Sequence, residues 1–452
     1  MATTRGNLNS SDPYNLYYDI NVVSDYDPTL TGTTAPPLTF NEIRQNPIIQ
    51  YPEDYLLSVV RFSLETPTLP IWIPQVLLGQ NNPDKLIYSW GMSITDYAVP
   101  ATPVTTFLTN AVNWIYEPDD ATAPTPAIPL VFQDLTGEYY YTYEFSRALI
   151  MANKALKAAF DAFNLQLAVD IGTPGGVPAA ISQNYCPQMV YDPIGELFSI
   201  NFPLCPPAEL VAAPPFAYDT YDQNMAGLAA LAVPLFTGRI VKLYMNTPLQ
   251  TLLNSFPTIY NGNSQTQLTQ GSEYTIIAYN NQYLNTTGGS RPTFPLTPIA
   301  AAGNATIPQI LVPQEHSTTI LWSPVSAIVF STSLLPVQNT LLSKPAIFNF
   351  YNGVNSSNLR SSGNNNVTAP VLTDFELQGA TGTSSQTRIT YTPTAEYRML
   401  DLRGTTPVNA IEVSVFWKDK FSGLHRFLLA AGCSATIKIL FRRKDFYNAT
   451  ID

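Results

Sequence analysis

The sequence predicts an all-β protein, an antiparallel jelly-roll β-sandwich with one accessory helix at about residues 144–167 and a large loop-rich insertion. Three observations lead to this prediction. Several segments alternate apolar and polar residues, only one long segment has helical periodicity, and 39 prolines are spread over 452 residues. Alternation with a period of two indicates half-buried strands, and proline cannot donate to a sheet ladder. Many strands joined by proline-rich connections are typical of sandwiches and jelly rolls.

The first 45 residues are polar, contain prolines and show weak periodicity, so we expect residues 1–45 to form an extended N-terminal arm. A disordered leader fits the same pattern. The next segment, 55–65, predicts a half-buried strand. We expect Leu56, Val60, Phe62 and Leu64 on its buried face and Tyr55, Arg61, Ser63 and Glu65 on the other.

The clearest period of two lies at 85–94. It places Leu86, Tyr88, Trp90, Met92 and Ile94 opposite Lys85, Ser89, Gly91 and Ser93. The only convincing helix starts near Glu144, and its apolar residues recur at three- and four-residue spacing. That stripe should pack against a sheet, and it consists of Phe145, Leu149, Ala152, Leu156, Ala159, Phe160, Phe163 and Leu167.

Residues 168–310 are rich in Pro, Gly and Ala and lack clear periodicity, so we expect an insertion or outer domain there. Short strands are predicted in and after it, at 197–202, 240–245, 274–279 and 319–330. Regular alternation returns at 411–418 and 436–442, where Ile411, Val413, Val415, Trp417, Ile437, Ile439 and Phe441 face the core. The jelly-roll body is therefore expected to comprise 46–167 and 311–452. From the whole chain we predict Trp417, Ile411, Val413, Ile437, Ile439, Tyr88 and Trp90 as core residues.

Only 12% of the residues are charged, while 45% are hydrophobic. A soluble monomer normally carries more charge on its surface, so this composition favours a surface that becomes interface; an Asn/Thr/Ser-rich polar surface is the alternative. The net charge is −11, and no Lys or Arg occurs between Lys157 and Arg239, so no direct nucleic-acid binding is expected. The last 52 residues hold eight basic and five acidic residues, which suggests a face toward an acidic partner or a solvated strand end.

No apolar run is long enough to span a membrane, and the start of the chain lacks a secretory pattern, so we expect a protein made in the cytosol. Three cysteines, Cys186, Cys205 and Cys433, are too few for a disulfide framework. Free thiols are expected, and a Cys186–Cys205 pair remains open.

Few residues could serve in catalysis or metal binding. His316 and His425 are the only histidines, and neither has a second ligand or a nucleophile motif nearby, so both are expected to be ordinary loop or strand-end residues. Glu117, Asp119 and Asp120 do not match a calcium loop and are interpreted as a solvated turn. We therefore expect no catalytic, cofactor-binding or metal-binding residues, no cofactor and no enzymatic activity.

Residues 389–446, from ITYTPTAEYRMLDLRG to FRRKDF, resemble the end of the minor capsid (penton) proteins of virophages and polinton-like viruses. Similar stretches are PVLTDFEL, STSLLPVQNT, YMNTPLQTLLNSFP and YLLSVVRFSLETPTLPIWIP. These proteins look related to the vertex proteins of the adenovirus lineage. The resemblance implies a single jelly roll that assembles as a pentamer at capsid vertices of the virion, with an insertion forming an outward domain.

The expected function is therefore a structural virion protein, a penton subunit whose partners are further copies of itself and the major capsid protein. A double jelly-roll major capsid protein forming trimers is the first alternative. A carbohydrate- or receptor-binding β-sandwich is the second, with a host receptor or glycan bound through the insertion. A polysaccharide-degrading enzyme is the third, although no pair of carboxylates stands out.

Overall fold

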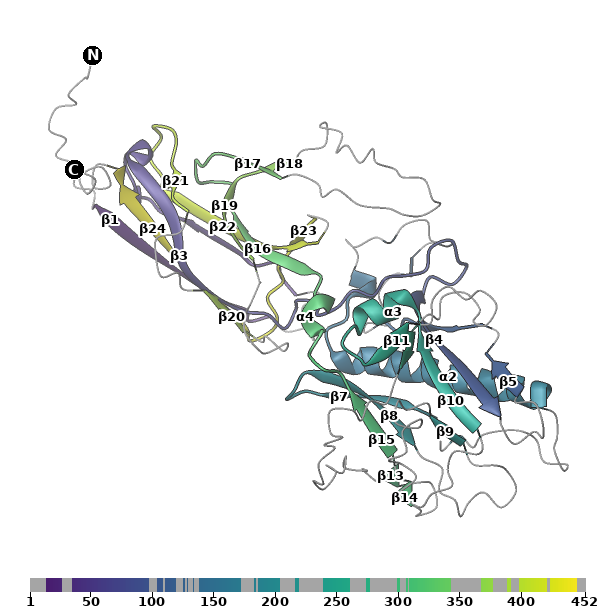
Figure 1. The fold of residues 1–452 in the computed structure, drawn as a ribbon. Coiled ribbons are helices and arrows are strands. Elements are labelled where there is room, and N and C mark those ends of the chain that lie inside the picture. Colours follow the sequence, from purple (N-terminus) through teal and green to yellow (C-terminus); the bar gives the residue numbers. More distant parts are fainter. Residues whose placement is uncertain are drawn as a thin grey trace, which may run out of the picture. The chain divides into compact units, whose positions relative to one another are not determined.

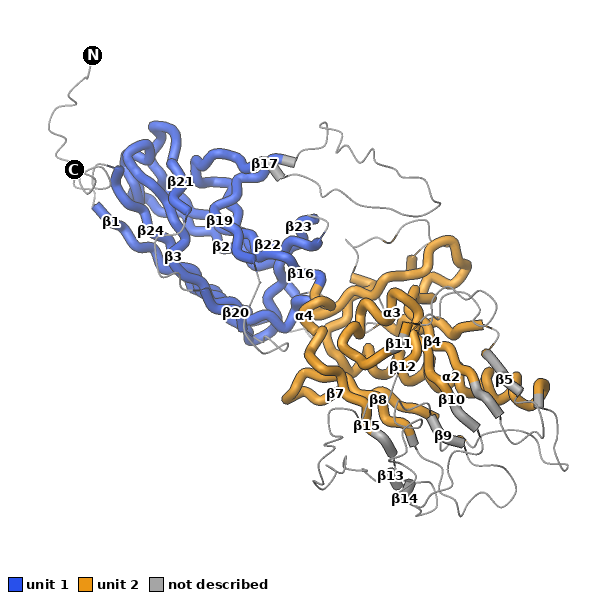
Figure 2. Tube along the Cα trace, in the orientation of Figure 1, with its two compact units in different colours: residues 1–70, 324–452 blue, residues 71–323 orange. Residues whose placement is uncertain are grey.

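The computed structural model describes most of the chain, namely residues 14–26, 35–96, 104–108, 110–118, 125–126, 128, 133, 138–171, 183, 186–203, 216–218, 239–260, 274–276, 299–300, 306–307, 309–342, 367–376, 388–391, 398–420 and 423–444. These residues form two compact units (Figure 2). Unit 1 comprises residues 1–70 and 324–452, and unit 2 comprises residues 71–323. Unit 2 is therefore inserted into a single connection of unit 1.

Unit 1 contains two antiparallel sheets that form the jelly-roll sandwich (Figure 1). The first has the order β1-β24-β3-β20, with β21 also paired to β3. Its strands are β1 (Asn15–Val23), β3 (Tyr55–Glu65), β20 (Arg388–Tyr391), β21 (Leu400–Asp401) and β24 (Ser434–Arg443).

The second sheet has the order β19-β16-β22-β2, with β23 paired to β22. Its strands are β2 (Thr39–Ile43), β16 (Val325–Ser331), β19 (Val371–Glu376), β22 (Ala410–Asp419) and β23 (Leu424–Arg426). A short pair of strands, β17 (Thr340–Leu342) and β18 (Val367–Ala369), and the 3₁₀ turn η1 (Pro52–Asp54) complete the described elements of unit 1.

The two sheets of unit 1 meet through an aromatic cluster. Phe62 of the first sheet lies 5.1 Å from Phe330 and 4.7 Å from Phe375 of the second, measured between ring centroids. Tyr391 stacks on Phe62 from the neighbouring strand at 5.6 Å. Offset and tilted aromatic pairs at such distances add to the burial energy of the rings, so this cluster fixes how the sheets face each other.

The expected burial pattern of the strand at 55–65 is only half correct. Phe62 and Leu64 are buried as predicted, but Tyr55, Leu57 and Val59 are buried in place of Leu56 and Val60. The cause is a register shift opposite β24, where Lys438 pairs with Arg61 but Ile439 pairs with Val59. The extra residue is Val60, and such a β-bulge reverses which side chains face the core.

The first 45 residues are not only an arm. They supply β1, which pairs with β24 from Asn15 to Val23, and β2, which pairs with β22 from Thr39 to Ile43. Tyr18 and Ile20 of β1 are buried. The prediction of a separate extended arm is corrected for these segments, because each adds an edge strand to one sheet of the jelly roll.

Unit 2 is built around a seven-stranded sheet with the order β11-β12-β10-β4-β5, to which β6 and β9 add on β4 and β10. Every described pair in it is antiparallel except β9 with β10. Its strands are β4 (Lys85–Asp96), β5 (Val104–Phe107), β6 (Val112–Ile115), β9 (Phe216–Tyr218), β10 (Arg239–Met245), β11 (Thr258–Tyr260) and β12 (Tyr274–Ile276).

Two smaller sheets belong to unit 2 as well. One has the order β15-β8-β7 and the other pairs β13 with β14. They consist of β7 (Gln188–Asp192), β8 (Leu197–Pro203), β13 (Ile299–Ala300), β14 (Thr306–Ile307) and β15 (Gln309–Pro313). The helical elements of unit 2 are η2 (Glu138–Tyr140), α2 (Phe145–Ile171), α3 (Thr247–Leu252) and α4 (Thr319–Trp322).

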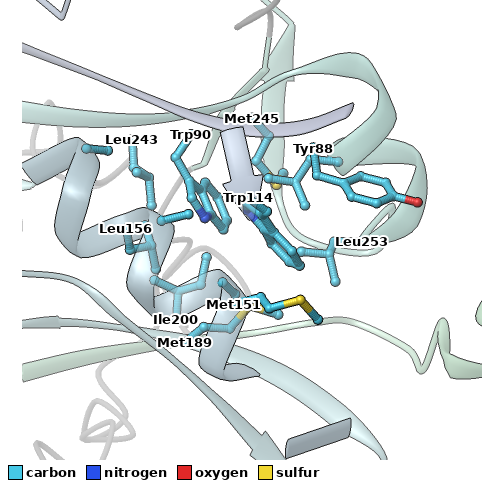
Figure 3. Packing of buried hydrophobic residues seen from close by; sticks show 14 of the residues in the cluster. Tyr88, Trp90, Trp114, Met151, Leu156, Met189, Ile200, Leu243, Met245 and Leu253 are labelled. Carbon is cyan, nitrogen blue, oxygen red and sulfur yellow. The ribbon is translucent and has the colours of Figure 1, made fainter. Parts of the chain in front are cut away.

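Helix α2 confirms the predicted accessory helix, and its apolar stripe packs into the core of unit 2. Figure 3 shows Met151 and Leu156 of this helix beside Trp90 and Trp114 from β4 and β6. The same core includes Ile200 from β8. The helix, the strand at 85–94 and the later strands thus share one core. The expected boundaries at 167 and 310 therefore do not match the compact units, which divide at 70 and 323.

The predicted strand at 319–330 is also corrected at its beginning. Thr319–Trp322 forms the short helix α4, and the strand β16 starts only at Val325. Pro324 lacks an N–H and separates the two elements. Trp322 is pulled into the core of unit 2, where it stacks on Phe198 at 4.8 Å.

All seven residues predicted as core are buried, with the tryptophans at 90 and 417 among them. The residues expected to face the core in the strands at 411–418 and 436–442 are all buried, but Glu412, on the opposite face of the first strand, is buried as well. The predicted strand at 274–279 is described only as far as Ile276.

Candidate assembly surface

The one histidine in a buried setting has a structural role. His425 of β23 stacks on Trp417 of β22 at 4.0 Å, and its Nε2 lies 2.8 Å from Oδ2 of Asp419. The other carboxylate oxygen of Asp419 accepts a hydrogen bond from the backbone N–H of Gly423 at 2.8 Å. This arrangement closes the β22–β23 hairpin from inside the sandwich, because it joins both strands and the connection between them.

The other residues considered for chemistry are dispersed. The carbonyl oxygen of His316 accepts a hydrogen bond from Ser255, and Glu117 pairs with Lys154. Asp119, Asp120 and Cys205 lie outside the described residues. Among the residues that the structure describes, no group of three or more His, Cys, Asp or Glu side chains is placed to hold a metal ion.

Cys186 and Cys433 are free thiols, and burial raises the pKa of Cys186 to about 12. A thiol with such a raised pKa is largely protonated near neutral pH and is a poor nucleophile. No helix in the described part of the chain is long and apolar enough to cross a membrane.

The basic residues near the end of the sequence are used in local pairs on unit 1. Lys438 of β24 lies between Asp19 of β1, at 3.1 Å, and Arg61 of β3, which itself lies 3.5 Å from Asp19. Arg443 lies over the ring of Tyr14 at 5.2 Å. These contacts favour the interpretation of the basic residues as a solvated strand end.

β1 is the terminal strand of the first sheet of unit 1. Within the described residues β1 pairs only with β24, and the register continues without a bulge from Asn15 to Val23. Opposite residues Tyr14 and Arg443 share a hydrogen bond, as do Ser24 and Cys433. Because N–H and C=O groups alternate in direction along an antiparallel strand, the even-numbered residues bond to β24. The N–H and C=O groups of Asn15, Tyr17, Asp19, Asn21 and Val23 therefore point to the outer edge.

Both edge strands, β1 and β2, carry exposed apolar side chains. Tyr17 and Val23 of β1 are 56% and 69% exposed, and Ile43 of β2 is 73% exposed. Natural proteins usually protect an edge strand with a bulge, a proline, or a covering segment, and inviting apolar edges are typical sites of strand addition. The pairing of β1 with β24 has no bulge and its sequence has no proline, while its central charge, Asp19, is paired with Lys438.

The two edge strands are tied together across the sandwich. The hydroxyl of Tyr18 donates to Oε2 of Glu42 at 2.5 Å, and Arg44 Nε donates to Oε1 of the same carboxylate at 2.6 Å. The Arg44 guanidinium also lies over the Tyr18 ring at 5.3 Å. These hydrogen bonds hold the pKa of Glu42 below its usual value. These contacts connect β1 of the first sheet to β2 of the second sheet.

Sequence reasoning missed both edge strands, although one signal was present. In NLYYDINVV the residues Leu16, Tyr18, Ile20 and Val22 alternate with Tyr17, Asp19, Asn21 and Val23. That alternation is the pattern of a half-buried strand.

A jelly-roll sandwich whose edge strand carries exposed apolar side chains, here Tyr17 and Val23, is typical of a structural protein that contacts further subunits. The model of the family described as Sputnik minor capsid protein V18/19 matches residues 16–443. The chain therefore belongs to this family of minor capsid proteins and is a structural component of the virion.

Two curated proteins of Sputnik virophage are similar to parts of the chain. The uncharacterized protein V18 is 31% identical over 176 residues, which cover 38% of this chain and 96% of V18. The structural protein V19 is 26% identical over 136 residues, which cover 30% of this chain and 56% of V19.

Two solved structures resemble the fold over nearly the whole chain. A chain of the cryo-EM structure of the Sputnik virophage has a TM-score of 0.62 at 22% identity, covering 96% of this chain and 99% of that chain. The crystal structure of the mavirus penton protein has a TM-score of 0.50 at 16% identity, covering 95% and 99%. Similarity over such a length includes both units.

The alternative of a double jelly-roll major capsid protein is not favoured. Unit 2 is not a second jelly roll of the kind seen in unit 1, because it buries the helix α2 against its strands and contains a parallel pair, β9 with β10.

Proposed function

We propose that the chain is a penton subunit, five copies of which form a ring at a vertex of an icosahedral capsid and contact the major capsid protein around it. The observation that carries this proposal is the fold similarity to the mavirus penton protein across both units, in a chain of a minor capsid family. Unit 1 is proposed as the assembling jelly-roll body and unit 2 as the outward domain, since unit 2 enters through one connection of unit 1.

The physical support comes from the shape of unit 1. A ring requires a heterologous contact, in which one surface of a subunit meets a different surface of the next. The first sheet of unit 1 offers two different edges, the long β1 edge on one side and the short β20 on the other. Such a subunit has the asymmetry that a closed ring needs.

The test is the oligomeric state of the purified full-length protein, measured by mass photometry and viewed by negative-stain electron microscopy over a range of salt concentrations. We expect closed rings of five copies. Trimers would favour the major capsid alternative, and a monomer at every salt and protein concentration would overturn the proposal.

A further inference from the structure

The two edge strands of the first sheet of unit 1 run in opposite directions. Its path β1-β24-β3-β20 contains four strands, and each neighbouring pair is antiparallel. Within the described residues, β1 pairs only with β24 and β20 pairs only with β3. When two copies are placed edge to edge in the same orientation, β20 of one copy therefore lies antiparallel to β1 of the other.

The backbone groups of the two edges also have the alternation that such pairing requires. Asp19 directs its N–H and C=O away from β24, so Lys438, which lies opposite Asp19, directs its own groups toward β3. Lys438 in turn lies opposite Arg61, which therefore bonds to β24. The register shift between the two strands begins beyond this pair, so it does not alter the alternation from Arg61 to Glu65.

The alternation continues across β3 to β20. Because Arg61 and its odd-numbered neighbours bond to β24, the even-numbered Leu64 bonds to β20, where it lies opposite Ile389. Ile389 thus directs its N–H and C=O toward β3, while Arg388 and Thr390 direct theirs to the outer edge of β20. The β20 edge presents its hydrogen-bonding groups at the same alternate spacing as the β1 edge.

The side chains at these edge positions lie on the outer face of the sheet. Ile20 and Ile389 are buried, so their neighbours Asp19, Arg388 and Thr390 project from the exposed face. Directly opposite residues of an antiparallel pair carry their side chains on one face. Pairing β20 with β1 consequently keeps the buried side chains on the core side and the exposed ones outside in both copies.

The charges of the two edges are complementary. In the register that places Arg388 opposite Asp19, opposite charges face each other, which stabilises a cross-strand pair. Within its own copy Arg388 lies 3.1 Å from Glu65, and Asp19 lies 3.1 Å from Lys438. The contact between copies joins these two ion pairs into one row of alternating charge.

The same register places Thr390 opposite Tyr17, whose side chain is exposed. An aromatic residue opposite a β-branched one is a favourable cross-strand pair. A β1–β1 pair, by contrast, places Asp19 opposite Asp19 of the other copy when the two strands overlap fully, and like charges directly opposite each other are destabilising. Such a pair is also two-fold symmetric, so it stops at two copies. The β20 edge of a second copy is therefore the better partner for β1.

We propose that β20 of one copy adds antiparallel to the outer edge of β1 in the next copy, with Arg388 opposite Asp19 and Thr390 opposite Tyr17. The contact is heterologous, because two different strands meet, and repeating it with a rotation that closes gives a ring. The first sheets of all copies then form one continuous sheet around the ring. This inference rests on the proposed penton function and names the contact between its subunits.

The experiment is disulfide crosslinking of the full-length protein that carries Tyr17→Cys and Thr390→Cys. Opposite residues of paired strands lie within the Cα separation that a disulfide spans. Inside one copy the two positions lie on the outer strands of a four-stranded sheet, about 14 Å apart, so a crosslink joins two copies. The matched control combines Asn21→Cys with Thr390→Cys, since Asn21 lies on the same face of β1 but about 13 Å out of register. The wild type reports any crosslinking by the three native cysteines.

A second pair of variants tests the hydrogen bonds between copies. Thr390→Pro removes an N–H on the outer edge, where proline is tolerated, and leaves the bonds of Ile389 to β3 in place. This variant should fold, as circular dichroism verifies, but form no rings. Thr390→Val keeps the N–H and the β-branched shape and should form rings as the wild type does. In wild-type rings the amides of Tyr17 and Asp19 should exchange about 100-fold more slowly than in the dissociated subunit.

Mild oxidation of the variant with Tyr17→Cys and Thr390→Cys should give a ladder of covalent oligomers that ends at five copies. The control with Asn21→Cys should crosslink no more than the wild type. Wild-type rings without a crosslink in the first variant, equal crosslinking in both variants, or rings formed by Thr390→Pro would each overturn the strand pairing but leave the penton function standing. A ladder that ends at three copies would support the pairing and overturn the five-fold function. A wild type that stays monomeric at every concentration would overturn both.

Discussion

Replacing Trp322 with alanine should destabilise unit 2 and leave unit 1 almost unchanged. Trp322 is 3% exposed, its ring contacts Phe198 at 4.8 Å, Trp72 at 5.0 Å and Phe145 at 5.6 Å, and its Nε1 donates to the carbonyl of Leu252 at 3.0 Å. All of these partners belong to unit 2. The substitution therefore leaves a cavity and an unpaired buried carbonyl in that unit.

The expected loss in the free energy of unfolding of unit 2 is about 3–5 kcal/mol, the usual range for removing a buried tryptophan. For a unit of this size it corresponds to a fall in melting temperature of about 6–20 °C. Trp322→Phe should cost less, about 1–2 kcal/mol, because a ring remains and mainly the hydrogen bond is lost.

Calorimetry and hydrogen exchange measured by mass spectrometry distinguish the units. The matched control is Phe330→Ala, which empties an equally buried site between the sheets of unit 1. Each variant should lower only the transition of its own unit. A single transition that shifts equally in both variants would refute the reasoning that the two cores are energetically separate.

Three further predictions concern single contacts. Asn246→Ala should destabilise unit 2 by about 2–4 kcal/mol, because the side chain caps α3 through the Leu249 N–H as well as binding β4. Asn246→Asp should not restore the stability, because its second carboxylate oxygen would face the carbonyl of Ile87, to which the Asn246 amide donates; wild-type stability of this variant in chemical denaturation would contradict this account. Gly423→Ala should destabilise the β22–β23 hairpin by about 1–3 kcal/mol, because a Cβ there would lie 2.6 Å from Oδ2 of Asp419; unchanged hydrogen exchange of β23 would count against it. Cys186 should resist alkylation by iodoacetamide at pH 8, where its thiol is protonated, and react only as the pH approaches about 12 or after unfolding. Its folded pKa is raised, so its contribution to stability is present below the ordinary thiol pKa and lost as the pH rises toward 12; rapid native labelling at pH 8 would disprove the assigned burial.

The sequence was sufficient to predict elements whose pattern is local. The helix at 144–167 and the strands at 85–94 and 411–418 were found because each carries its own uninterrupted period. Their core residues, such as Trp90 and Trp417, were predicted for the same reason. Membership of a capsid protein family was predicted from resemblance to known sequences and not from physical reasoning.

Features that depend on distant partners were not predictable in this way. The bulge at Val60 exists only relative to β24, which lies hundreds of residues later in the sequence. The boundaries at residues 70 and 323 depend on the packing of α2 into the core of unit 2. Amino-acid composition does not predict which core a helix packs into. The edge of β1 is a property of sheet order, so its importance could not be recognised before its neighbour was known.

The contact between Trp72 and Trp322 has a consequence for how unit 1 reaches its native topology. These residues flank the points where the chain enters and leaves unit 2, and their ring centroids are only 5.0 Å apart. Folding of unit 2 already includes the entropy cost of bringing the two ends of its long segment together. For unit 1, the connection from β3 to β16 then costs no more entropy than a short loop would. Domain insertions with adjacent ends are well tolerated at such sites. The same jelly roll could therefore accept an unrelated domain at this connection, and exchange of the whole insertion offers a route by which related capsid subunits diverge.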